Sequence, residues 1–279
     1  DALNSLHIFN NINANGTYKS ECYVDWFGAI PYYEDIDNPI NSDASIQLAL
    51  NSGFREIRFN VGIYYIANTL LLDSVKHIVL SGNATTSFAS AYGIKYDKPI
   101  VDSTIISTKN DIDLLHIAIT KYRNSNHDNK VSLFIEGGCF DVSKIDYNSS
   151  VIKFIGKDCT IWSHKINTTI YGPLSEITIN DTIDLNTKGI GIEYTEESDA
   201  TGYFYIATID IRGFTYGIKN SMLESSHITS FDIKGLIDGC VTHIDMGVGI
   251  EYSRITSTIQ PRRYFDDNAK TYCIIGKFN

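Results

Sequence analysis

Short apolar runs closed by turn-forming residues dominate the chain after about residue 55. Examples are "EIRFNVGIYYI" (56–66), "HIVLSG" (77–82), "STIIST" (103–108) and "SVIKFIG" (150–156), and similar runs continue to residue 260. Each run is apolar or alternates apolar with polar residues, and Gly, Asn, Asp or Ser follows it, as is typical of β-strands. The frequent Ile, Thr and Tyr also favour strands, because their side chains suit a pleated, half-buried surface. The pattern predicts an all-β chain.

One stretch has a helical pattern instead. In "NSDASIQLALNSGF" (41–54), Ser42 or Asp43 can cap a helix whose apolar side is Ile46, Ala49 and Leu50. Gly53 then suits the position just after the helix. We expect one short helix here, ahead of the strands.

Three similar lines occur late in the chain: "TIDLNTKGIGI" (182–192), "TIDIRGFTYGI" (208–218) and "SFDIKGLIDGC" (230–240). Aligned on the Asp they are offset by 26 and then 22 residues, and Ile255 again lies 22 residues after Ile233. About two dozen residues suit one coil of a parallel β-helix, in which coils stack ~4.8 Å apart. The apolar neighbours of each Asp, such as Ile209 and Ile211, should then point inwards.

Five stretches between residues 24 and 108 follow a recognisable order. They are "VDWFGAI" (24–30), "NSDASIQLALNSG" (41–53), "EIRFNVGIYYIANTLLL" (56–72), "HIVLSGN" (77–83) and "STIIST" (103–108). In this order they resemble the entry motif, the capping helix and the strand motifs of the pectate-lyase-like, right-handed parallel β-helix superfamily. The resemblance implies a single-stranded β-helical solenoid with a short N-terminal capping helix. We expect an arm at 1–23, the solenoid at 24–260 and an extension at 261–279.

The chain departs from the family pattern at several positions. Asn60 stands where Pro is usual, Ile63 replaces Thr, and the paired Asp of the helix cap is reduced to Asp43. The loop "PYYEDIDNPI" (31–40) replaces a short Gly-Asp-Gly turn. The catalytic motifs of polygalacturonases and plant-cell-wall pectate lyases are absent from the sequence, which argues against a pectinase.

Within this superfamily, the Asn-, Ile- and Tyr-rich style with few Pro most resembles bacteriophage tailspikes and tail appendages. That resemblance implies a homotrimer in the phage virion that binds a bacterial surface glycan, a capsule or O-antigen, often with its depolymerisation. The N-terminal arm would then contact other tail or baseplate proteins. Two alternatives stay open: a non-catalytic tail, baseplate or adhesin component, and a secreted polysaccharide lyase.

The Asp of the repeated line is the first candidate for chemistry. If the strands alternate, Asp184, Asp210 and Asp232 point outwards and form an acidic column, with carboxylates roughly 5 or 10 Å apart. Such distances are close to those between the two catalytic carboxyls of glycosidases. The column, with Glu193 from the loop that follows the first line, is therefore a candidate acid and base.

A structural role for this column is the stronger alternative. Arg212 and Lys234 follow Asp210 and Asp232 by two residues and would point the same way, so they can neutralise the carboxylates. Arg212 is also a candidate glycan-binding residue. Tyr203 and Tyr205 are further candidates, because sugars stack on exposed aromatic rings that also carry a polar group.

The composition excludes several other classes of protein. A net charge of -10 argues against a nucleic-acid partner, since phosphate binding needs clustered Lys and Arg. The seven His and five Cys show no metal-ligand spacing, so we expect no metal or cofactor and interpret the Cys as buried free thiols. No apolar run is long enough to span a membrane.

Overall fold

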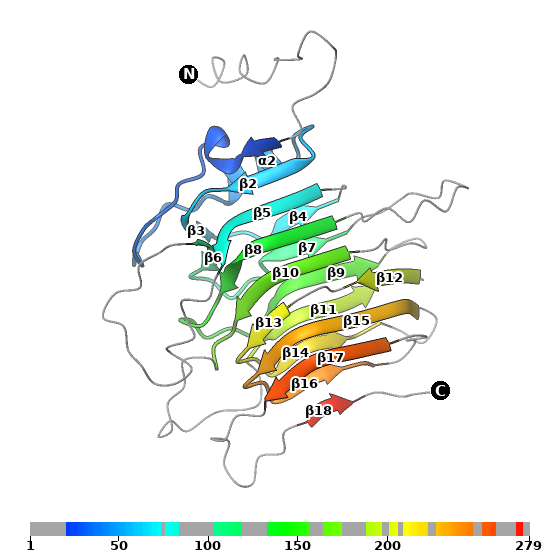
Figure 1. The fold of residues 1–279 in the computed structure, drawn as a ribbon. Coiled ribbons are helices and arrows are strands. Elements are labelled where there is room, and N and C mark those ends of the chain that lie inside the picture. Colours follow the sequence, from blue (N-terminus) through cyan, green and yellow to red (C-terminus); the bar gives the residue numbers. More distant parts are fainter. Residues whose placement is uncertain are drawn as a thin grey trace, which may run out of the picture.

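The structure, a computed structural model, describes residues 21–73, 76–83, 103–118, 133–156, 164–174, 188–196, 201–205, 209–222, 227–247, 253–260 and 272–275. These residues form a parallel β-helix with one α-helix, α2 (Asp43–Leu50), and one 3-10 helix, η1 (Val24–Phe27), at its N-terminal end (Figure 1). Every pair of strands in the two sheets is parallel. The predicted all-β solenoid with a short capping helix is confirmed.

The strands are β1 (Glu21–Tyr23), β2 (Glu56–Phe59), β3 (Gly62–Ile66), β4 (Leu70–Leu72), β5 (Lys76–Asn83), β6 (Thr104–Thr108), β7 (Leu115–Ile117), β8 (Leu133–Asp141), β9 (Ser150–Gly156), β10 (His164–Tyr171), β11 (Ile190–Glu196), β12 (Thr201–Tyr205), β13 (Ile209–Arg212), β14 (Tyr216–Asn220), β15 (His227–Asp238), β16 (Thr242–Asp245), β17 (Ser253–Gln260) and β18 (Tyr272–Ile275). Strands β1 and β18 lie outside the range 24–260 expected for the solenoid, yet they join its sheets.

The strands stack into three faces, because the longest strands bend midway. The first half of β8 pairs with β5 and its second half with β6, and β15 pairs in the same way with β12 and then β13. Face 1 therefore contains β1, β2, β5, β12 and the first halves of β8, β10, β15 and β17. Face 2 contains β3, β6, β13 and the second halves of those long strands. Face 3 is the separate sheet of β4, β7, β9, β11, β14, β16 and β18.

Inward-pointing aliphatic and aromatic side chains stack in register along each face and form the core. Face 1 contributes Ile57, Ile78, Ile135 and Ile166; face 2 contributes Ile106, Phe140, Ile170, Ile211 and Ile237; face 3 contributes Leu70, Leu115, Ile152, Ile192, Ile218 and Ile244. All of these side chains are buried, as is Ile209. Each contributes about 1.5–3 kcal/mol to the hydrophobic stabilisation.

The capping helix covers the first coil as the sequence predicts. Ile46, Ala49 and Leu50 are buried in the main core cluster. Ser42 is the N-cap residue as predicted, but neither it nor Gly53 makes the expected capping interaction. The Oγ of Ser42 accepts a hydrogen bond from the Ile30 amide at 2.9 Å and caps no helical amide, and Gly53 has no positive φ.

Asp43 ties the helix to the next coil instead of capping it. Its carboxylate accepts hydrogen bonds from the Ala67 amide at 3.3 Å and from the Asn68 side chain at 2.7 Å.

In η1, the Asp25 carboxylate accepts hydrogen bonds from the Tyr64 hydroxyl at 2.7 Å and from the side chain of Asn60. Asn60, which stands where the resembled family has Pro, therefore holds the entry motif (24–30) through Asp25.

The register of the repeated lines differs from the predicted alignment at one step. Asp210 lies beside Leu236 and Ile211 beside Ile237, 26 residues on, whereas the predicted offset here was 22. The next step is correct, since Ile233 lies beside Ile255. An error of four residues still leaves every inward side chain pointing inwards and every outward one pointing outwards, because strand alternation has a period of two. The apolar pattern alone therefore cannot detect it.

The cysteines agree in part with the prediction of buried free thiols. Cys22, Cys139 and Cys240 are buried and form no disulfide, whereas Cys273 forms no disulfide and is exposed. Cys159 lies outside the described residues.

Glycine is required where β15 bends from face 1 to face 2. Gly235 has φ +118°, and a Cβ there would lie 2.0 Å from the carbonyl oxygen of Ile209 on the neighbouring coil. A side chain at this position would therefore push two coils apart.

We expect Gly235→Ala to lower the free energy of unfolding by about 2 kcal/mol or more, because it adds backbone strain to this clash. Gly53→Ala is the matched control, since its Cβ would meet nothing within 4 Å, and it should change stability by less than about 0.5 kcal/mol. Urea unfolding monitored by circular dichroism compares them. Equal effects of the two changes would contradict the bend argument.

Candidate functional site

A column of charged side chains runs along the outer surface of face 3. His116, Lys153, Glu193, Lys219 and Asp245 occupy successive coils in register, one from each of β7, β9, β11, β14 and β16. The core residues on either side of each point inwards, so alternation along the strand directs these five outwards. We call these five residues the face-3 column.

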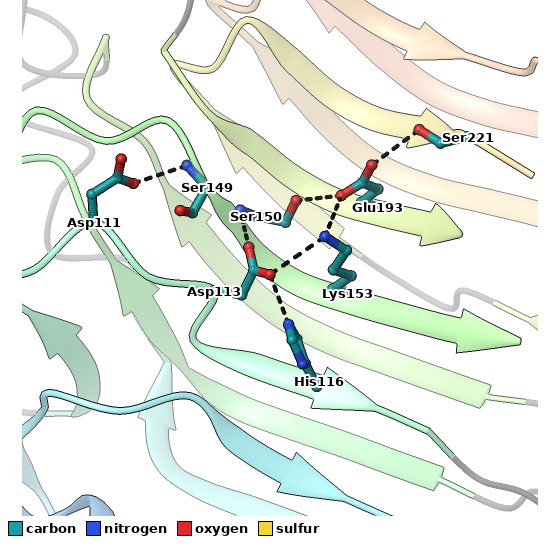
Figure 2. A network of polar contacts seen from close by, with 8 residues as sticks. All are labelled: Asp111, Asp113, His116, Ser149, Ser150, Lys153, Glu193 and Ser221. Carbon is teal, nitrogen blue, oxygen red and sulfur yellow. Dashed lines mark hydrogen bonds and ion pairs between the residues drawn. The ribbon is translucent and has the colours of Figure 1, made fainter. Parts of the chain in front are cut away.

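Lys153 joins two carboxylates at the middle of the column (Figure 2). Its ammonium nitrogen lies 3.4 Å from Asp113 Oδ2 and 3.4 Å from Glu193 Oε2. Glu193 also accepts hydrogen bonds from the hydroxyls of Ser150, at 2.7 Å, and Ser221, at 3.0 Å. Four consecutive coils are thus linked through one glutamate and one lysine.

Asp113 lies just before β7 and has partners on its own coil and the next. It contacts His116 Nε2 at 2.7 Å and accepts a hydrogen bond from the Ser150 amide at 2.7 Å. Burial opposes ionisation, but these hydrogen bonds and the charge of Lys153 outweigh it and lower the pKa of Asp113 below its usual value. Asp113 is therefore a carboxylate at neutral pH.

A second aspartate fixes the turn that leads into this cluster. Asp111 accepts a hydrogen bond from the amide of Ser149 at 3.0 Å (Figure 2). It accepts another from the amide of Asn148 at 2.9 Å. The chain therefore enters β9 with Ser150 already oriented towards Asp113 and Glu193.

The charges of this cluster suit binding better than acid–base catalysis. Asp113 and Glu193 each lie 3.4 Å from one ammonium, so the two contacting oxygens are at most about 7 Å apart, a separation found in glycosidases. A general acid needs a raised pKa, however, and that of Asp113 is lowered. Burial works against the charge of Lys153, yet Asp113 and Glu193 raise its pKa, so it is no general base at neutral pH.

Asp210 and Asp232, the two described members of the predicted acidic column, do not stack on one another. Asp210 on face 2 lies beside Thr169 and Leu236, whereas Asp232 on face 1 lies beside Tyr205 and Arg254. Asp232 is four residues before Leu236 on the same strand, which is roughly 13 Å along it. Asp184 lies outside the described residues. Of the predicted catalytic residues, only Glu193 belongs to the face-3 column.

The ion pairs that the sequence suggested are present. Asp210 binds Arg212 through two contacts, at 2.8 and 2.7 Å, and Asp232 lies 3.8 Å from Lys234. Arg212 is buried, with 3% of its surface exposed, so it offers no open surface to a glycan in this structure.

Tyr203 and Tyr205 are placed only by their backbone. They lie in β12 beside Ser230 and Asp232 of β15, and their side chains lie outside the described residues. Their proposed role in glycan binding stays a prediction.

Five residues of this cluster were not predicted from the sequence: Asp113, His116, Ser150, Lys153 and Ser221. Alternation within the predicted strands was enough to predict that the side chains of His116 and Lys153 point outwards. Their meeting depends on the register between coils, and 37 residues separate His116 from Lys153, with 40 more to Glu193. Because these coils are long and unequal, the sequence has no regular repeat here that could be aligned to predict the register.

No protein-family model matches this chain, and no curated protein matches its sequence. Among the described residues, no helix is long and apolar enough to cross a membrane. The same part of the chain has no cluster of three or more His, Cys, Asp or Glu placed to hold a metal ion.

Two carboxylates with contrasting partners allow a direct test of the ion pairs. Asp210→Asn removes the charge from the two short hydrogen bonds that Asp210 accepts from the buried Arg212, so we expect the free energy of unfolding to fall by about 2–3 kcal/mol. Asp232 faces Lys234, whose side chain is 41% exposed, so Asp232→Asn should lower the free energy of unfolding by less than about 1 kcal/mol. Urea denaturation measures both, and similar losses would show that the burial of Arg212 does not matter.

The lowered pKa of Asp113 predicts a pH dependence. A carboxyl whose pKa is lower in the folded state stabilises the protein above its unfolded pKa, near 4, and this contribution is lost as pH falls through the folded value. Asp113→Asn should therefore lower the melting temperature at pH 7 and lose this effect progressively below about pH 4.

Thermal unfolding of the native protein and of Asp113→Asn, from pH 7 down to the lowest pH at which both fold, measures the difference in melting temperature. Asp146→Asn is the control, because the side chain of Asp146 is 75% exposed and should contribute little at any pH. A difference for Asp113→Asn that does not change with pH would refute the electrostatic explanation.

Proposed function

We propose that this chain is a tailspike-like β-helical protein that binds a bacterial surface polysaccharide, capsule or O-antigen, along face 3. The observation that supports this is the face-3 column itself. It places one ionisable side chain on each of five successive coils, in register along the axis. A linear series of donors and acceptors on a rigid scaffold suits an extended polymer with repeating hydroxyl groups.

The matched charges favour binding without cleavage. Asp113 and Glu193 both contact Lys153. Glu193 also accepts hydrogen bonds from two serine hydroxyls. The contacts of Asp113 lower its pKa and stabilise its ionised form, which can accept hydrogen bonds from sugar hydroxyls but cannot protonate a glycosidic oxygen. The same observation favours the second candidate, a non-catalytic tail, baseplate or adhesin component.

The wider setting follows from the resemblance to the pectate-lyase-like superfamily and to tailspikes. We propose a homotrimer in a phage virion, with the N-terminal arm contacting other tail or baseplate proteins. A secreted polysaccharide lyase is the other location and activity consistent with that superfamily. Analytical ultracentrifugation distinguishes a trimer from a monomer, and a monomer would count against the tailspike assignment.

Binding is tested with purified capsular polysaccharides and O-antigens from a panel of bacteria. We expect one of them to bind, and Lys219→Ala to weaken its affinity about tenfold, or ~1.4 kcal/mol, through loss of one charged donor. Arg254→Ala is the matched control, because Arg254 is an exposed cation on β17 of the other sheet. Its affinity should change less than about twofold.

Two further outcomes decide between the candidates. No binding to any polysaccharide would refute glycan recognition and favour the structural component. New reducing ends during incubation would show hydrolysis, and unsaturated uronate absorbance would show a lyase; either would contradict binding without cleavage.

A further inference from the structure

The loop over residues 31–40 places a carboxylate among basic side chains of the solenoid. Asp35 Oδ1 accepts a hydrogen bond from Lys109 Nζ at 2.8 Å, and its Oδ2 accepts one from Lys144 Nζ at 3.0 Å. The hydroxyl of Tyr65 donates to Asp35 as well. We call Tyr65, Lys109 and Lys144 the basic cradle.

The solenoid builds this cradle without help from the loop. Tyr65 belongs to β3, Lys109 follows β6 directly, and Lys144 follows β8, so three consecutive coils each supply one donor. The ammonium of Lys109 also lies 5.1 Å from the centre of the Tyr65 ring, a cation–π contact that orients both groups. The register of face 2 therefore fixes the positions of the three donors relative to one another.

The cradle has the chemistry of a carboxylate site. Burial opposes ionisation of Asp35, but hydrogen bonds from Lys109, Tyr65 and Lys144 and the charge of Lys144 hold its pKa far below the usual value. The carboxylate of Asp141 also acts on Tyr65, so the two lysines leave a net positive charge only once Asp35 has left the cradle. Charge-assisted hydrogen bonds of this kind are stronger than neutral ones.

We propose that the basic cradle binds the carboxylate of an acidic saccharide, and that Asp35 occupies the cradle as a competing ligand from the same chain. This names the class of glycan within the proposed function and rests on it. On a chain with a net charge of -10, a local cationic site is what an acidic polymer needs in order to bind.

The contacts of the loop allow this exchange. The side chains of Asp35, Lys109 and Lys144 are 37%, 33% and 46% exposed, and ion pairs this exposed contribute little net stability. Tyr33 and Ile40 on the same loop are 66% and 63% exposed, so they bury little apolar area. Beyond the carboxylate, the amide of Ile36 donates to the Tyr65 hydroxyl at a longer 3.3 Å.

The base of the loop is held separately from Asp35. Tyr32 exchanges two backbone hydrogen bonds with Ile63, at 2.9 and 2.6 Å, and Pro31 packs against Gly62 so closely that a Cβ there would lie 2.5 Å away. The carboxylate can therefore leave the cradle while the loop stays attached to β3.

The test measures binding of a hyaluronate hexasaccharide to the full chain by isothermal titration calorimetry. Asp35→Asn removes the competing carboxylate, so we expect an affinity about tenfold higher than that of the native protein, as for a site about 90% occupied by its own competitor. Adding Lys109→Gln and Lys144→Gln to that variant should abolish the gain. A carboxyl-reduced hexasaccharide should not distinguish the variants.

Asp37→Asn is the matched control, because it removes one negative charge from the same loop and pairs with neither lysine among the described contacts. It should leave the affinity within about twofold of native. Circular dichroism and melting temperature establish that each variant folds.

The inference is overturned if Asp35→Asn binds the hexasaccharide no more tightly than native, if Asp37→Asn gains as much, or if the gain survives loss of both lysines. The proposed function would remain supported if a polysaccharide still binds in a manner that depends on Lys219. Its failure is therefore distinguishable from failure of the cradle.

Discussion

In-register stacking of parallel strands determines almost everything else in this structure. The backbone hydrogen bonds of successive coils fix which residues lie above one another, and they do so for the inner and outer surfaces together. On face 3 the inward ladder from Leu115 to Ile244 and the outward column from His116 to Asp245 arise from one register. A slip of one residue would place the charges in the core and the isoleucines in water.

This register also explains the sequence of charges in the column. Side chains at equivalent positions of neighbouring coils lie roughly 5 Å apart, where two like charges at the surface repel by about 3 kcal/mol. From Lys153 onwards the signs alternate: Lys153, Glu193, Lys219 and Asp245. On face 1, Arg58 pairs with Glu21 and Glu56, and His77 lies 3.4 Å from Glu56 and 2.9 Å from Glu136. A solenoid stacks its outer side chains so closely that carboxylates acquire cationic partners, which limits how readily such a surface provides a general acid.

The sequence was sufficient for the fold and for the direction of most side chains, and insufficient for the site. Local patterns located α2, the strands and the inward positions of Ile209 and Ile211, because these depend on periodicity within a few residues. The column of Asp210 and Asp232 was wrong because a shift of four residues preserves that periodicity. The glycines carried the missing information. Gly213 and Gly239, 26 residues apart, both adopt positive φ directly after β13 and β15, and aligning them gives the observed register.

Two of the departures from the superfamily pattern that the sequence resembles bring new polar contacts. Asn60, in place of the usual proline, bonds to Asp25 of the entry motif. The long loop in place of a short turn brings Asp35 to Tyr65, Lys109 and Lys144. The stacked core tolerates such changes because it depends on alternate inward residues and leaves loops and outward positions free to vary. A binding function in this chain therefore belongs to its loops and outer columns, and the regular ladders hold those groups at fixed spacing.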